Sequence, residues 1–135
     1  MLQLRFEDTE LWDERNEIFV TIKGQTLQLE HSLISIAKWE SKWKKPFLSR
    51  EPKTREETID YIRFMTITQN VNPLLYLNIS DRQIQEVNAY IDDPMTATTI
   101  SKIEGKGASW KVITNQEIYF YMVSYQIPFS CEKWH

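Results

Sequence analysis

The period of the apolar residues changes within the stretch LQLEHSLISIAKWESKWKKP, which runs from residue 27 to residue 46. Before Ser32 the apolar residues alternate with polar ones, which is the pattern of a half-buried β-strand. Ser32 is a suitable N-cap, and Pro46 ends the helix that follows it. The apolar side of this helix carries Leu33, Ile36, Trp39 and Trp43. The stretch therefore predicts an α+β fold in which strands precede helices.

The first thirty residues carry strand patterns on either side of an acidic stretch. Apolar and polar residues alternate over residues 2–6 and 26–30, and residues 17–22 are rich in β-branched and aromatic types. Lys23-Gly24 is suited to a tight turn, because glycine adopts a positive φ without steric cost. We therefore predict an N-terminal β-hairpin or small antiparallel sheet, with residues 7–16 as a polar stretch between strands.

Three further helices begin with a capping box. In this motif the side chain of a Ser or Thr accepts a backbone N–H of the first turn, and a Glu or Gln three residues later accepts the backbone N–H of that Ser or Thr. The boxes begin at Thr54, Ser80 and Thr114. They predict helices over residues 54–68, 80–92 and 114–125.

A short β-hairpin is predicted between the last two of these helices, over residues 96–100 and 109–113, because the glycines at 105 and 107 separate two strand-like segments. Neither repeats nor linkers divide the chain. The predicted fold class is therefore α+β: a mainly α-helical single domain, residues 1–135, with a small N-terminal antiparallel sheet.

The helix over residues 118–125 is apolar nearly all round, which is typical of a central helix or of one that docks a partner. After Pro128, Phe129 and Ser130 have the pattern of a further helix start, so we expect a C-terminal helix that is cut short at 135. An apolar strip should then lie open for a client helix or for a second copy of the chain. The candidate partner-binding residues are Ile118, Phe120, Tyr121, Tyr125, Phe129 and Trp134.

The composition argues against several classes of protein. The chain has 135 residues, a net charge of −3, one cysteine and two histidines. One cysteine excludes a disulfide framework or a cysteine-cluster metal site. His31 and His135 are far apart in the sequence and have no paired ligand at i+3 or i+4. A nucleophile elbow is missing, as are a signal peptide and an apolar run of about 20 residues. We therefore expect no enzyme, no cofactor, no metal and no membrane association.

The segment 38–55 holds seven cations and two acids, together with Trp39 and Trp43. Basic residues interleaved with tryptophans can bind single-stranded nucleic acid by stacking. Helical geometry instead places both tryptophans beside Ile36 as core residues, with the lysines on a separate stripe. That stripe is either solvated or meets the acidic segment 7–17.

Glu40 falls on the apolar face of the same helix, where we expect it to form an ion pair with a nearby Lys or Arg. A catalytic carboxylate is the alternative.

Several segments resemble one family of bacteriophage proteins. The residues concerned are 31–48, which include the string KWESKWKKPF, and 60–63, 65–66, 94–98, 127–129 and 131–135. They resemble tail assembly chaperones of long-tailed, siphovirus-type phages. The resemblance implies binding to the tape-measure protein and to tail-tube subunits in the host cytoplasm, and absence from the finished virion. A structural virion protein of the tail or head–tail junction and a small nucleic-acid-binding protein are the alternatives, and a homo-oligomer is possible.

Overall fold

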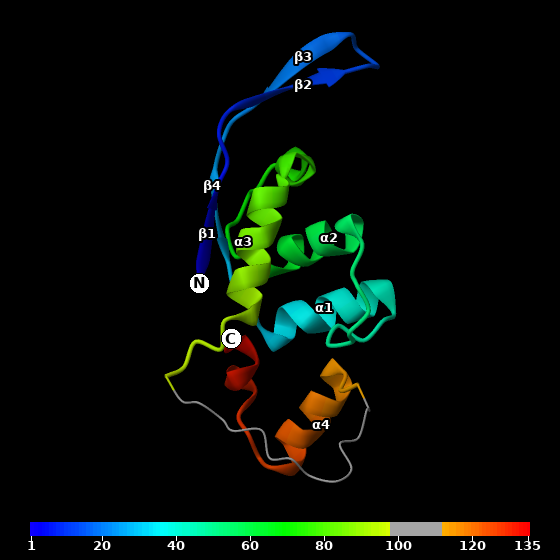
Figure 1. Cartoon of the computed structure of the whole chain (residues 1–135), viewed down its shortest axis with the longest axis vertical. Helices are drawn as coiled ribbons and strands as arrows, with labels where there is room; N and C mark the ends of the chain where they lie inside the picture. Colours follow the sequence, from blue (N-terminus) through cyan, green and yellow to red (C-terminus); the bar gives the residue numbers. More distant parts are fainter. Residues whose placement is uncertain (98–111) are drawn as a thin grey trace.

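The structure is a computed structural model that describes residues 1–97 and 112–135. It has an α+β fold, as the change of period at Ser32 predicts (Figure 1). The strands come first and the helices follow. In chain order the described elements are β1 (Leu2–Arg5), β2 (Thr9–Asp13), β3 (Ile18–Ile22), β4 (Thr26–Leu29), α1 (Leu33–Trp43), α2 (Arg55–Met65), the 3₁₀ helix η1 (Pro73–Asn78), α3 (Asp81–Asp92), α4 (Asn115–Ser124) and the 3₁₀ helix η2 (Phe129–Lys133).

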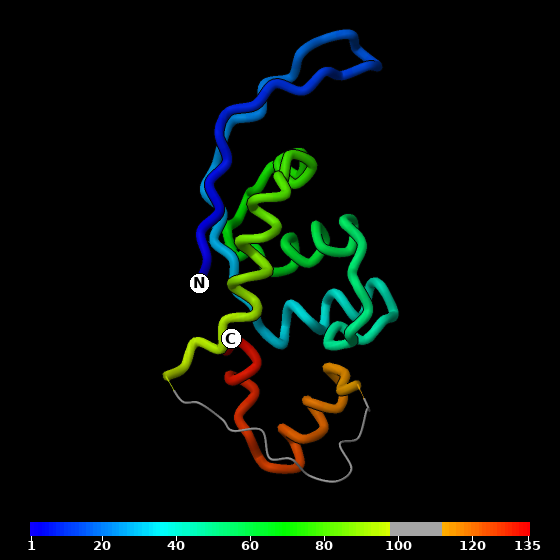
Figure 2. Tube along the Cα trace, viewed as in Figure 1, coloured from blue at the N-terminus to red at the C-terminus, as the bar shows by residue number. Residues whose placement is uncertain are grey.

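The four strands form one long, bent hairpin (Figure 2). β1 pairs with β4 next to the helices, with Leu4 opposite Leu27, and β2 pairs with β3 further out, with Trp12 opposite Phe19. The chain reverses at residues 14–17, where Glu17 adopts a φ of 50°. Asp13 closes this turn, because its carboxylate accepts the backbone N–H of Arg15 at 2.9 Å.

Two details of the predicted sheet are wrong. Residues 9–13 form a strand, although they lie in the acidic stretch, because they face β3 across the hairpin and leave the charged side chains in solvent. Gly24 makes a bend between β3 and β4 and is not the hairpin turn. A Cβ there would meet the carbonyl oxygen of Phe6 at 2.2 Å, so close approach of the backbones requires the glycine.

The hydrophobic core lies between the β1–β4 ribbon and the helices α1, α2 and α3. The bond from the Ile67 N–H to the Gln28 carbonyl, at 2.8 Å, ties the end of α2 to β4. Leu27, Leu29 and Ile62 are fully buried. Further members of this core are Leu4, Phe6, Ile22, Ile36, Trp39, Phe47, Tyr61, Met65, Leu75, Tyr76, Ile79, Val87 and Tyr90.

The predicted helix starts are confirmed. Ser32, Thr54 and Ser80 each accept a first-turn N–H with their side chain, as N-caps do. α2 ends at residue 65 instead of near 68, because residues 66–68 continue as an extended segment beside β4. The 3₁₀ helix η1 was not predicted; its first residue is Pro73, and Asn72 caps it.

Two predictions concern the last third of the chain. The hairpin over 96–100 and 109–113 lies mostly outside the described residues. In place of the helix predicted after Pro128 there is the short 3₁₀ helix η2, and Ser130, expected at the helix start, lies within it. None of the helices that the structure describes is long and apolar enough to cross a membrane.

Candidate functional site

The candidate site is the outer face of α4 and the segment that follows it. α4 lies against α1 at the end of the molecule opposite the tip of the hairpin (Figure 1). Met122 is buried in this contact, and Ile118, one turn earlier on the same side, is half-buried. Besides α1, the C-terminal segment with η2 lies against α4 in the described part of the chain.

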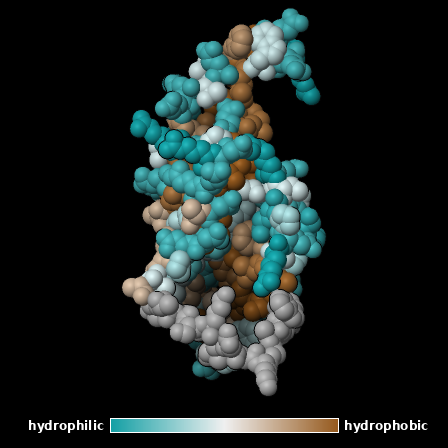
Figure 3. All heavy atoms as spheres, viewed as in Figure 1, coloured by the Kyte–Doolittle hydropathy of each residue, from teal (hydrophilic) through white to brown (hydrophobic). Residues whose placement is uncertain are grey.

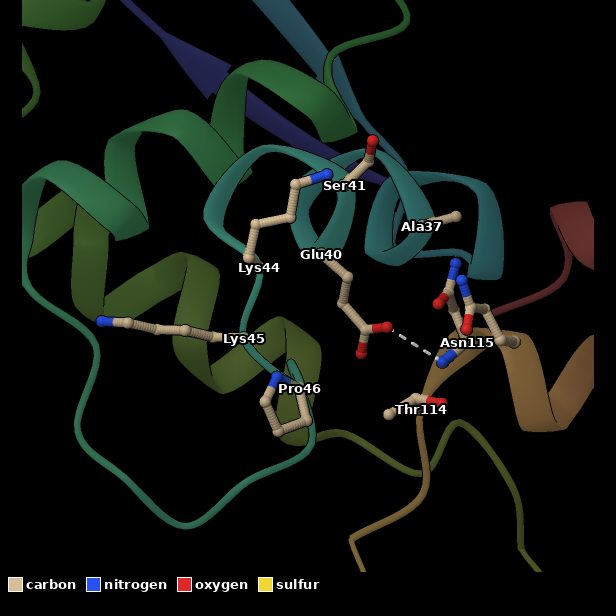
Figure 4. A pocket seen from close by; sticks show the side chains of 9 residues that line it. Ala37, Glu40, Ser41, Lys44, Lys45, Pro46, Thr114 and Asn115 are labelled. Atoms are coloured by element: carbon tan, nitrogen blue, oxygen red, sulfur yellow. Dashed lines mark hydrogen bonds between the residues drawn. The ribbon is translucent and has the colours of Figure 1, made fainter.

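Glu40 fixes the start of α4. Its carboxylate accepts the backbone N–H of Asn115 at 3.0 Å (Figure 4). It also accepts the backbone N–H of Phe47 at 2.8 Å. Asn115 is the first residue of α4, so the charge also lies at the positive end of the helix dipole. One buried side chain therefore connects α1, the loop after it and α4.

The predicted ion pair of Glu40 with a Lys or Arg is not found among the described residues. Within residues 1–97 and 112–135 no Lys or Arg pairs with it. Figure 4 shows Lys45 extending away from the carboxylate, and the Lys45 ammonium bonds Glu57 at 2.6 Å. Two backbone donors compensate the buried charge of Glu40 in place of a cation, because hydrogen bonds to the ionised form offset its desolvation. The cavity beside Glu40, about 360 Å³, is lined by residues of α1, the following loop and the start of α4.

The middle and end of α4 are held by the C-terminal segment. The Tyr119 hydroxyl donates to the Glu132 carboxylate at 2.8 Å. Burial and this bond raise the pKa of Tyr119 to about 12, so the hydroxyl keeps its proton at neutral pH. The Ile127 N–H bonds the Met122 carbonyl at 2.8 Å, and Gln126, with a φ of 55°, turns the chain back.

His135 anchors the far end of this segment. Its ring lies 5.0 Å from the ring of His31 and 4.8 Å from that of Tyr90, and Nε2 lies 3.1 Å from the Asp93 carbonyl oxygen. Tyr90 in turn donates to Glu30 at 2.9 Å. The segment 126–135 is therefore attached to α3 and to the start of α1, and it supports α4 from one side.

These supports leave a cluster of aromatic side chains in solvent. Phe120 is 67% exposed and Tyr125 73% exposed, and Tyr121 lies between them with ring centroids 5.8 and 6.3 Å away. Phe129 is also exposed and lies beside Tyr119. We call Phe120, Tyr121, Val123, Tyr125 and Phe129 the α4 aromatic surface.

The remaining two candidate partner-binding residues lie elsewhere. Ile118 and Trp134 line a cavity of about 270 Å³ between α1, α4 and the C-terminal segment. Met122, Ile127 and Cys131 form part of the same wall. Ile118 therefore belongs to the packing of α4 on α1, and Trp134, 71% exposed, lies at the mouth of the cavity.

The two tryptophans of α1 differ in their surroundings. Trp39 is fully buried, as predicted, and its Nε1–H donates to the Glu57 carbonyl at 2.9 Å. Trp43 was also predicted as a core residue, and this is wrong: it is only partly buried against the core. Its neighbour Lys42 pairs with Asp60 of α2. The lysine stripe therefore meets the acids of α2 and not the segment 7–17, and Trp39 has no face free for a base.

Sequence reasoning missed a second exposed aromatic pair. Trp12 and Phe19 lie opposite each other on β2 and β3, with ring centroids 4.9 Å apart, and both are exposed. Leu11 and Trp12, two apolar residues inside an acidic stretch, were the sequence signal for a strand here. A hairpin with its turn at residues 14–17 explains why they lie there. The described residues hold no group of three or more His, Cys, Asp or Glu that could bind a metal.

Neither protein-family models, nor curated proteins, nor solved structures yield a match to this chain.

Proposed function

We propose that this protein is a tail assembly chaperone of a long-tailed bacteriophage. In this proposal it binds the tape-measure protein, tail-tube subunits or both in the host cytoplasm during tail morphogenesis. The resemblance of the segments around residues 31–48 and 127–135 supports this family, and the α4 aromatic surface is the proposed place for a client.

The α4 aromatic surface is the observation that carries the proposal. An apolar patch on a monomer is unusual unless something binds it. Here the patch lies on a helix held at its start by Glu40, in its middle by Tyr119 and at its end by the turn at Gln126. A preorganised surface loses little entropy when a client binds, and an amphipathic client helix presents apolar side chains in matching rows. The proposal includes no catalytic step.

Co-expression with the tape-measure protein tests this proposal. We expect the wild-type chain to keep the tape-measure protein in the soluble fraction. Replacing Phe120 and Tyr125 together by Ser should abolish this effect, since both side chains are exposed and the change leaves the core intact.

A matched control removes exposed apolar groups away from α4. Ile67 and Leu77 are 52% and 64% exposed, and the double variant Ile67→Ser/Leu77→Ser should keep the tape-measure protein soluble. Equal loss in both double variants would count against the α4 aromatic surface. Stoichiometric presence of the chain in purified virions, measured by mass spectrometry, would instead favour a structural virion protein and refute the chaperone.

A further inference from the structure

The outer half of the hairpin, residues 7–22, has a charge unlike that of the rest of the molecule. We call it the hairpin arm. It carries six acids and one cation, Arg15, for a net charge of −5. The whole chain has a net charge of −3, so the other 119 residues together carry +2. The acids are Glu7, Asp8, Glu10, Asp13, Glu14 and Glu17.

These acids have no cationic partner within the described residues. Asp13 accepts hydrogen bonds from the turn that it closes, and Asp8 accepts the N–H of Gly24 at 2.7 Å. No ion pair joins the arm to the body of the molecule in residues 1–97 and 112–135. Leu11 and Ile22 pack at the core, but the outer end of the arm projects beyond the helices, so the field there is directed at solvent (Figure 1).

One face of the arm is apolar at its centre. Trp12 and Phe19 are 51% and 66% exposed and contact each other across the strands. Glu10 and Thr21, opposite each other two residues away, lie on the same face because alternate residues of a strand share a side. The other face bears Leu11, which packs against the core. The arm is a two-stranded sheet, so both outer edges also carry unpaired backbone groups.

The chain's own basic segment is not a counterpart for the arm. Lys42 pairs with Asp60, Lys45 with Glu57 and Arg55 with Asp81. These pairs use three of the seven cations in residues 38–55, so a second copy offers fewer free cations than the sequence count indicates. Two arms would repel each other, and nucleic acid has the same sign of charge as the arm.

We propose that the hairpin arm is a second binding surface, which takes a basic segment of a different protein. Lys or Arg side chains of that segment pair with the arm's acids, and its apolar side chains cover Trp12 and Phe19. The open edge of β2 or β3 accepts it as an added strand. The proposal does not depend on the chaperone function, because it uses no residue of the α4 aromatic surface.

A peptide titration of the full chain tests the proposal. The probe is a fluorescent peptide that alternates Lys and Val, compared with one that alternates Glu and Val. We expect binding of the Lys peptide alone, measured by fluorescence anisotropy, and weaker binding as salt is raised. The variant Glu10→Lys/Glu14→Lys should weaken it at least about tenfold, and so should Trp12→Ser, which keeps the charge.

The control variant Glu51→Lys/Glu86→Lys changes the net charge by the same amount on exposed sites outside the arm. It should alter the affinity by less than about twofold, since exposed charges beyond about 10 Å are screened. An equal loss in this control, equal binding of the Glu peptide, or no binding of the Lys peptide would overturn the proposal. Self-association of the wild-type chain that Glu10→Lys/Glu14→Lys abolishes would also overturn it, because the occupant would then be a second copy.

Discussion

Glu40 is the residue on which the position of α4 depends. Its two acceptors satisfy the N–H groups of Phe47 and Asn115. In Glu40→Ala both donors lose their partner, and we expect the free energy of unfolding to fall by about 2–4 kcal/mol. Glu40→Gln keeps one carbonyl acceptor and should lose less. Urea denaturation measures both values.

A matched control for Glu40 is Glu86, an exposed acid on α3. Its replacement by Ala should change the free energy of unfolding by less than about 0.5 kcal/mol. If Glu40→Ala is as mild as Glu86→Ala, Glu40 does not hold α4 as described.

Trp39 and Trp43 should differ in how much they contribute to the free energy of unfolding. Trp39 is fully buried and its indole N–H is bonded, so Trp39→Ala should cost about 3–5 kcal/mol. Trp43 is partly exposed, and its Nε1 has no partner among the described residues. Trp43→Ala should therefore cost less, about 1–2 kcal/mol. Thermal or urea unfolding of the two variants checks the order; equal costs would contradict it.

His31 should make stability depend on pH. Burial, and then the neighbouring His135, lower the pKa of His31 to about 4 from 6.5. The Tyr61 hydroxyl, whose own pKa burial raises, lies within hydrogen-bond distance of Nδ1, at 2.5 Å. Since the folded pKa is the lower one, this contribution to stability is complete above pH 6.5 and is lost as pH falls toward 4.

His31→Gln removes the titrating ring but can still form a hydrogen bond with the Tyr61 hydroxyl. We expect its free energy of unfolding to fall less steeply between pH 6.5 and 4 than that of the wild type, measured by urea denaturation at several pH values. Parallel curves for the two proteins would show that His31 does not cause the dependence.

Among the elements, the bent hairpin depends on Gly24. A Cβ at this position would meet backbone atoms of Phe6 and Glu7 at 2.2–2.8 Å, and neither can move without disturbing the ribbon. Gly24→Ala should therefore cost about 1–3 kcal/mol. Lys23→Ala, at the exposed neighbouring position, should change the stability by less than about 0.5 kcal/mol. Equal stabilities of the two variants would show that the bend does not require a glycine at position 24.

The helices were predictable because their starts are encoded locally. The caps at Ser32, Thr54 and Ser80 bond residues three positions away, so a short stretch of sequence contains the whole signal. The strand over residues 9–13 was not predictable in this way, because its partner β3 and the turn at 14–17 decide it. Its charged residues point to solvent, and they obscure the alternation of apolar and polar residues by which a strand is recognised in a sequence.

The candidate site could also be predicted in part, where the information lies within a short stretch of sequence. The apolar character of residues 118–125 is visible in the sequence, and Phe120, Tyr121, Tyr125 and Phe129 are indeed exposed. The partner of Glu40 was missed because Asn115 is 75 residues away and bonds through its backbone. Because every residue except proline has a backbone N–H, the residue type at 115 does not indicate that it bonds Glu40.

At the scale of the whole molecule, the structure separates two exposed aromatic groups. The hairpin arm and the α4 aromatic surface lie at opposite ends of the body (Figure 1). In Figure 3 hydrophilic (teal) atoms cover much of the surface between these ends. Partners at the two ends would not compete for the same surface, so a basic segment on the arm should leave a client on α4 undisturbed.

The most direct test of the central claim is a hydrogen–deuterium exchange footprint of the chain with and without the tape-measure protein. With the client in about tenfold excess over its Kd, we expect amide exchange over residues 118–125 and 129–134 to slow about tenfold. Exchange in the buried helix α2, residues 55–65, should stay unchanged. Binding that leaves residues 118–134 unprotected, or absence of binding, would contradict the account.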